Sequence, residues 1–154
     1  MQKRTLSLIV VVAVLALSVS ARALDEQRPL TGTMEGYDEY GLPGSCGGGL
    51  GLPLTSTGTG QVAHFGKAVM VSPVCLAADF SVIGEWRFTI TGANGDAISG
   101  VVTGWVFTSY GFDLFATITE GTGRFAGATG DLTFPTLSNG TGVWSSTIEG
   151  WISY

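Results

Sequence analysis

The amino-acid sequence predicts an all-β fold, an antiparallel closed β-barrel of about eight strands. From Thr55 onward, apolar and polar residues alternate with a period of two, and β-branched and aromatic residues are abundant. Glycine-rich turn signals divide this stretch at short intervals and helix signals are nearly absent, a spacing typical of a sandwich or a barrel. Glycines inside or beside the expected strands, at Gly100, Gly104, Gly127, Gly130, Gly142 and Gly150, favour the barrel, because such glycines tend to mark bulges and corner bends.

The N-terminal residues have the order of a secretory signal peptide. The basic start Met1–Arg4 precedes an apolar run from Leu6 to Val19 and the small-residue pattern Ala21-Arg22-Ala23. The run is shorter than the roughly 20 apolar residues that a membrane-spanning helix needs. We therefore expect residues 1–23 to be a signal peptide cleaved after Ala23, and a secreted or periplasmic location. A retained membrane anchor is the alternative.

Residues 24–54 are expected to form a flexible, glycine-rich leader, and residues 55–154 the barrel domain. The leader is polar at first and then contains the string Gly44-Ser45-Cys46-Gly47-Gly48-Gly49-Leu50-Gly51. One short strand is expected at Leu30–Met34, followed by a long loop.

About seven further strands are expected after this leader. They lie at about 61–72, 75–83, 85–91, 97–108, 111–120, 129–135 and 141–153. The clearest turn is Asn94-Gly95, because this pair readily adopts the positive φ angles of a type I′ hairpin turn.

The alternation assigns one face of each strand to the barrel interior. Trp86, Phe88 and Ile90 share one side of their strand, and the same parity applies to the later strands. The inward residues there are Phe112, Leu114, Ala116, Ile118, Trp144, Ile148 and Ile152. The outward rows are not cleanly polar, since they include Val101, Trp105, Phe107, Phe115 and Trp151. Exposed apolar rows indicate a protein partner, and a homo-oligomer, a dimer or a trimer, is expected.

Cys46 and Cys75 are the only two cysteines of the chain. An even number of cysteines in an exported protein indicates a disulfide, and two free buried thiols are the alternative. Together with His64, the single histidine, they supply too few ligands for a metal site. No metal and no cofactor is therefore expected.

The charge of the chain disfavours two classes of partner. Three of the 7 basic residues and none of the 12 acidic residues lie in residues 1–23, which leaves four basic residues against 12 acidic ones, a net charge of −8. A protein that binds nucleic acid needs a basic stripe, which the scattered Arg28, Lys67, Arg87 and Arg124 do not form. Anionic membrane surfaces are disfavoured for the same reason.

The most distinctive string is Gly121-Thr122-Gly123-Arg124-Phe125-Ala126-Gly127-Ala128-Thr129-Gly130. It resembles the glycine-rich hairpin of the allene oxide cyclase-like and dirigent-like β-barrels, and residues 58–66 resemble the first long strand of their small secreted bacterial members. The resemblance implies a calycin-like barrel of about eight strands, often trimeric, whose lumen holds a hydrophobic molecule. Such relatives direct the cyclisation or coupling of reactive intermediates without metal or nucleotide. No catalytic carboxylate or arginine of the family aligns with this chain residue by residue.

Two polar residues are candidates for a catalytic group. His64 is read either as a rim residue with a structural hydrogen bond or as part of the cavity lining. Glu120 continues the inward parity of Phe112 and Ile118, so it is expected at the inner rim, where desolvation would raise its pKa and suit proton transfer. A solvated carboxylate at a strand end is the alternative reading of Glu120.

These observations predict a binding module whose lumen holds a small hydrophobic ligand. The expected lining residues are Trp86, Phe88, Phe112, Leu114 and Trp144. Three alternatives remain open. The first is a cofactor-independent cyclase or isomerase, the second a structural oligomeric extracytoplasmic protein, and the third an outer-membrane barrel, favoured by the aromatic C-terminal residues.

Overall fold

The computed structural model describes residues 26–154, so the expected signal peptide and its cleavage site lie outside the described residues. Within 26–154, no helix is long and apolar enough to cross a membrane. The elements in chain order are β1 (Arg28–Pro29), β2 (Gly32–Tyr40), the 3-10 turn η1 (Gly47–Gly49), β3 (Leu52–Val62), β4 (Gly66–Leu76), β5 (Arg87–Gly92), β6 (Ala97–Phe107), β7 (Gly111–Gly121), the 3-10 turn η2 (Gly123–Phe125), β8 (Thr129–Ser138) and β9 (Val143–Ser153).

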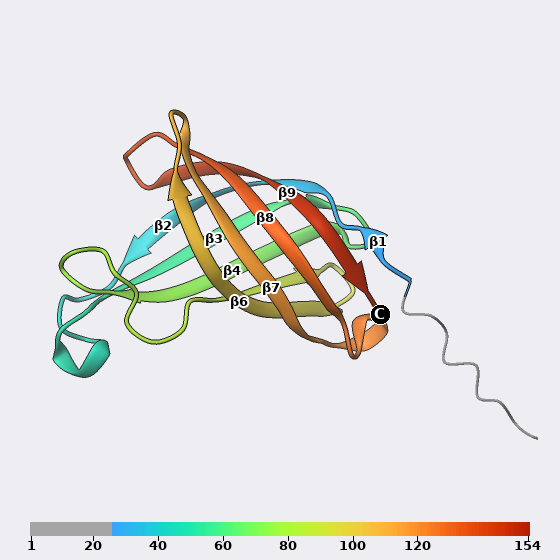
Figure 1. Ribbon diagram of the computed structural model, residues 1–154, viewed down its shortest axis with the longest axis horizontal. Coiled ribbons are helices and arrows are strands. Elements are labelled where there is room, and N and C mark those ends of the chain that lie inside the picture. Colours follow the sequence, from blue (N-terminus) through green and yellow to red (C-terminus); the bar gives the residue numbers. More distant parts are fainter. Residues whose placement is uncertain (1–25) are drawn as a thin grey trace, which may run out of the picture.

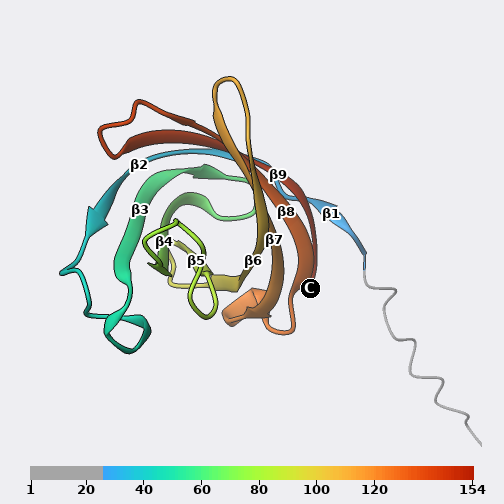
Figure 2. The same ribbon diagram turned by 60° about the vertical axis from the view of Figure 1, so that its left-hand side comes forward.

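The eight long strands form a closed antiparallel barrel, which confirms the predicted fold class (Figure 1). Each strand from β2 to β8 pairs with the next one along the chain, and β9 also pairs with β2, which closes the barrel. The short strand β1 pairs with the end of β9 beside β2. Figure 2, which looks further into the barrel, shows the wall curving round on itself. Closure leaves the long strands without a free edge.

The first half of the barrel differs from the strands expected there. The strand expected at Leu30–Met34 is longer and is displaced, since β2 spans Gly32–Tyr40 and forms part of the barrel wall, so the barrel begins upstream of residue 55. Glycines 58 and 60 lie inside β3 and do not end it. The turn falls instead at His64, whose φ of 67° divides the strand expected at 61–72. The strand expected at 75–83 is mostly a loop.

Two β-bulges in the β6–β7 ladder reverse the side-chain parity that simple alternation predicts. On β7, Thr119 is an extra residue between the pairs Ser99–Glu120 and Gly100–Ile118. On β6, Thr103 is an extra residue between the pairs Val102–Ala116 and Gly104–Phe115. A bulge places one unpaired residue in a strand and so turns the residues beyond it to the other face.

The predicted disulfide between Cys46 and Cys75 is present. It ties the β2–β3 connection to the end of β4, at the end of the barrel opposite the C-terminus. A disulfide fits an oxidising, extracytoplasmic compartment.

Buried aromatic side chains pack against one another at the end of the barrel that carries the C-terminus, which we call the closed end. Phe125 is fully buried there, stacks on Phe65 with ring centroids 4.3 Å apart and meets the edge of Tyr154 at 4.8 Å. The isoleucines packed beneath it, all with at most 1% exposure, are Ile90, Ile98, Ile118, Ile148 and Ile152. The lumen is therefore plugged at this end.

Candidate functional site

Among the described residues, the lumen has free space toward the opposite end, which we call the open end. A cavity of about 70 Å³ lies there, lined mostly by apolar side chains from seven of the eight long strands and from the β4–β5 connection. The structure brings all five expected lining residues, Trp86, Phe88, Phe112, Leu114 and Trp144, to this one cavity. The volume is below that of cavities that hold benzene, about 150 Å³, so one ring or a short branched chain enters the lumen only if its walls move outward.

Trp144 occupies its position because glycines replace side chains on the neighbouring strands. Its indole lies over Gly36 and Gly58, where an added Cβ would come within 2.4 Å of the ring. The register pairs Gly36 with both Trp144 and Gly58, so all three residues face inward at one level of the barrel. These glycines therefore provide the room that a buried indole needs.

The indole nitrogen of Trp144 is the unusual polar group of this cavity. Trp144 is 6% exposed, and its Nε1 is buried without a hydrogen-bond partner. The hydroxyl of Thr108 is the second such atom among the described residues, and it does not line the cavity. A buried donor without an acceptor typically costs about 1–3 kcal/mol. An acceptor atom on a ligand would satisfy it.

The other buried polar groups of the lumen are already paired. The indole of Trp86 donates to the hydroxyl of Ser72 at 2.8 Å, and this hydroxyl donates to the carbonyl of Arg87. The hydroxyl of Thr136 lies 3.1 Å from that of Ser146, which also lies 3.1 Å from the carbonyl of Pro135. These internal bonds leave the Trp144 N–H as the free donor of the cavity.

Asp38 is a lining residue that the sequence reasoning missed. It lies on β2 and is half-buried at the cavity, and the hydroxyl of its cross-strand partner Ser56 donates to its Oδ1 at 2.6 Å. The second carboxylate oxygen, Oδ2, has no protein donor among the described residues. The alternation of Met34, Gly36 and Asp38 on one face was the available signal, hidden by the acidic composition of the segment.

The mouth of the cavity is flanked by aromatic side chains. Because of the bulge at Thr103, Trp105 pairs with the inward residue Leu114, and its ring meets Trp86 edge-on with centroids 5.9 Å apart. Phe107 pairs likewise with Phe112. The expectation that Trp105 and Phe107 belong to an outward row is therefore wrong. Of that row, Phe115 is exposed on the outer wall, while Val101 and Trp151 are half-buried.

Neither catalytic candidate reaches the lumen. Glu120 lies beyond the bulge at Thr119, so it faces outward with Ser99, and its side chain is 68% exposed and 3.3 Å from Arg87. The expected inner-rim position of Glu120 is thus wrong, and the solvated reading describes it. His64 is exposed in the β3–β4 turn at the closed end, where its Nε2 lies 3.0 Å from the carbonyl of Pro29. This contact matches the reading of His64 as a rim residue.

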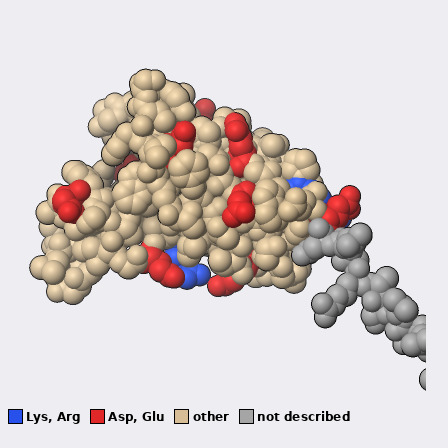
Figure 3. Space-filling model, viewed as in Figure 1, with Lys and Arg blue, Asp and Glu red and all other residues tan. Residues whose placement is uncertain are grey.

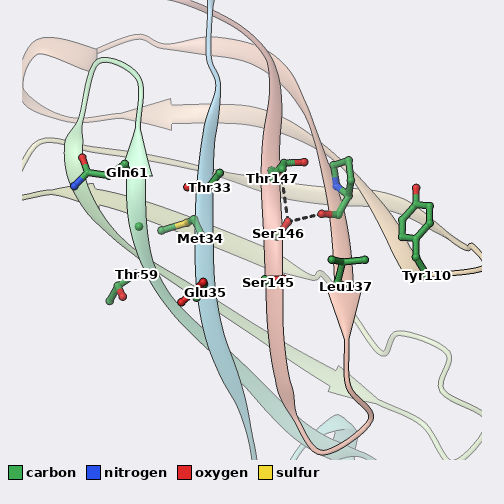
Figure 4. Close-up of a pocket in the computed structure, with 12 residues that line it drawn as sticks. Thr33, Met34, Glu35, Thr59, Gln61, Tyr110, Leu137, Ser145, Ser146 and Thr147 are labelled. Atoms are coloured by element: carbon green, nitrogen blue, oxygen red, sulfur yellow. Dashed lines mark hydrogen bonds between the residues drawn. The ribbon is translucent and has the colours of Figure 1, made fainter.

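A larger groove of about 630 Å³ lies on the outside of the barrel (Figure 4). Thr33 and Glu35 on β2, Ser145 and Thr147 on β9 and Gln61 on β3 line it, and Tyr110 stands at one side. The lining is typical of a solvated outer sheet face. Unlike the lumen, this groove holds no buried polar atom that lacks a partner. Among residues 26–154, no group of three acidic, histidine or cysteine side chains is placed to hold a metal ion.

Comparisons with known proteins concern the fold. No protein-family model matches the sequence, and no curated protein matches it. One solved structure, described as the pterocarpan synthase dirigent protein GePTS1, is similar with a TM-score of 0.61. The sequences are 13% identical, and the match covers 92% of this chain and 99% of that chain. The chain therefore has a dirigent-like β-barrel fold, closed at one end and open at the other.

Proposed function

We propose that the protein binds a small, neutral and largely apolar molecule through the open end of its lumen. The observation that carries this proposal is the buried Trp144 N–H without a partner, set in an otherwise apolar, one-ended cavity. Such a site binds a molecule that buries a ring or branched chain and offers one hydrogen-bond acceptor. Asp38 at the cavity would accept a hydrogen bond from a ligand hydroxyl.

The ligand we expect extends beyond the lumen. The cavity of about 70 Å³ is well below the about 300–1,000 Å³ of typical small-molecule pockets, so the remainder of the ligand would lie at the mouth, between Trp86 and Trp105. As part of the same proposal, we retain the secreted or periplasmic location and the kinship with small bacterial allene oxide cyclase-like proteins. The first is supported by the disulfide and the second by the string at 121–130.

The test uses two neutral probes, 1-naphthol, which carries a hydroxyl, and carvone, which carries only an acceptor. Calorimetric titration should give 1:1 binding to the protein. Leu114→Trp, which fills the cavity from its wall, should abolish it, whereas Phe115→Trp, one residue along on the outer wall, should leave it unchanged. Trp144→Phe should weaken the binding of both probes by about tenfold, the value of one hydrogen bond. Equal affinities for Leu114→Trp and the parent protein would refute the lumen as the site.

Asp38 supports a second candidate, a cofactor-independent cyclase or isomerase. A carboxylate beside an apolar cavity is placed to move a proton on a bound molecule, which a binding module does not need. The similar solved structure is named a synthase, and this name describes that protein. Asp38→Asn keeps the size and polarity of the side chain. If the protein is such an enzyme, this variant should keep the binding of carvone, which has no hydroxyl for Asp38 to accept, and lose turnover, whereas a pure binding module has no turnover to lose.

A further inference from the structure

Three of the four connections at the open end carry or adjoin strongly exposed apolar side chains. The β2–β3, β4–β5, β6–β7 and β8–β9 connections lie along one boundary of the molecule, away from the C-terminus (Figure 1). The most exposed large apolar residues of the described chain lie in or beside the first three of these connections. They are Leu42 at 78%, Leu50 at 81%, Phe80 at 70% and Phe107 at 83%. The closed-end turns at 63–65, 93–96 and 122–128 carry no exposed large apolar residue. We call Leu42, Leu50, Phe80 and Phe107 the apolar rim.

The structure holds this rim in place by specific interactions. Phe80 has a φ of 63°, a left-handed conformation that is costly for a bulky residue, and its N–H donates to the carbonyl of Ala77. Beside it, the N–H and the hydroxyl of Ser81 both donate to Oδ1 of Asp79. The disulfide at Cys46 fixes the connection that carries Leu42 and Leu50. Strain that keeps an aromatic ring in water indicates a functional position.

The charges of the barrel are distributed unevenly between its ends. Of the four basic residues in 26–154, three, Arg28, Lys67 and Arg124, lie at the closed end. The fourth, Arg87, is paired with Glu85 and Glu120. On the face shown in Figure 3, no basic group lies at the left-hand, open end, and acidic groups do. The hydrogen bonds from Ser81, its hydroxyl first, lower the pKa of Asp79, so this rim carboxylate stays charged.

We propose that the apolar rim docks the open end on a bilayer surface formed by choline headgroups. The outermost charge of such a headgroup is a quaternary ammonium, which aromatic rings and carboxylates attract. Phe80, Phe107 and Asp79 supply these groups, and Leu42 and Leu50 supply apolar tips that reach the acyl boundary. The carboxylate of Asp79 and the other acidic groups at the open end would repel an anionic surface.

The arrangement of the rim fits a fluid surface better than a protein surface. The rim side chains stand on separate connections around the mouth of the lumen, and a lipid surface adapts to separated tips. A protein partner would need a continuous complementary face. Docked in this way, the lumen opens onto the lipid, so an apolar molecule would enter without crossing water. The docking goes beyond the ligand binding proposed above and does not depend on it.

The test is sedimentation of the chain starting at Leu24 with sucrose-loaded dioleoylphosphatidylcholine vesicles. This start removes the apolar run at 6–19, which would bind lipid by itself, and keeps every strand of the barrel. Phe107→Ser and Leu50→Ser should each lower the partition coefficient by about tenfold, because each removes one exposed apolar side chain that docking would bury in the bilayer. Phe80→Gly should do the same while leaving the fold at least as stable, since glycine adopts a φ of 63° without strain.

A matched control removes apolar surface elsewhere. Val69→Thr with Val71→Thr alters two exposed valines on the outer wall of β4 and should leave vesicle binding unchanged. Trp144→Phe should also leave it unchanged, which separates docking from ligand binding. The proposal is overturned if the protein stays in solution at millimolar phosphatidylcholine, or if phosphatidylglycerol vesicles bind it equally well. It is also overturned if rim variants abolish a lipid-independent self-association, which would assign the rim to a second copy of the chain.

Discussion

The two ends of the barrel use aromatic residues in opposite ways. At the closed end, Phe65, Phe125 and Tyr154 pack against one another and seal the interior. At the open end, Trp86 and Trp105 pair beside a cavity, and Phe107 is 83% exposed. The same side-chain chemistry thus stabilises the fold at one end and remains available for binding at the other. The residues that stabilise the fold and those of the proposed binding site are therefore separated along the barrel axis.

The largest effect on stability should come from a substitution at the closed end. Phe125→Ala should lower the free energy of unfolding by about 3–5 kcal/mol, because it leaves a cavity among fully buried side chains. Phe107→Ala, at the other end, should change it by less than about 0.5 kcal/mol. Urea unfolding of both variants measures the two changes in the free energy of unfolding, and comparable losses at the two ends would contradict the difference between them.

The disulfide should have the next largest effect on stability, and its loss should loosen chiefly the open end. Replacing Cys46 and Cys75 together by serine should cost about 2–4 kcal/mol of stability. Amide exchange should quicken in the β2–β3 and β4–β5 connections and stay slow around Phe125. If exchange quickens equally throughout the barrel, the two ends do not differ in the way described.

A smaller effect should follow from narrowing the space below Trp144. Gly58→Ala would place a Cβ within 2.4 Å of the indole, so the ring must shift, at a cost of about 1–3 kcal/mol. Gly104→Ala is the control, since nothing lies within 4 Å of its added Cβ and its φ is not positive. Thermal unfolding should separate the two variants. Loss of carvone binding by Gly58→Ala alone would support the cavity beside Trp144 as the binding site.

The smallest effect on stability and on probe binding should come from substituting Glu120. Its ion pair with Arg87 is exposed, and such pairs contribute roughly 0–1 kcal/mol. Glu120→Gln should therefore leave both stability and probe binding nearly unchanged in the same titrations. A marked loss of binding would place Glu120 in the binding site. It would contradict the outward position that the bulge at Thr119 gives to this residue.

The sequence predicted the second half of the barrel well because alternation there is interrupted only locally. Phe88, Leu114 and Trp144 face the lumen as the parity required, and the two cysteines are bonded. Parity failed for Trp105 and Glu120, since Thr103 and Thr119 are ordinary strand residues and nothing in their chemistry marks a bulge.

The first half was harder to predict because the residues that shape it also serve as loop signals. Glycines 36 and 58 look like loop residues, yet they lie in strands, where they accommodate Trp144 from another strand. Asp38 was missed for the same reason, since its strand reads as a polar leader. Such positions depend on a partner distant in sequence, and only the closed barrel reveals that partner.

The most direct test of the account follows the indole N–H signal of Trp144 by NMR while 1-naphthol is added. Binding in the lumen predicts that this signal shifts first and most, together with the amide signals of Phe88 and Leu114. The signal of Tyr154 at the closed end should not shift. Shifts confined to Thr33, Gln61 and Ser145 would instead put the probe in the outer groove and contradict the lumen as the binding site.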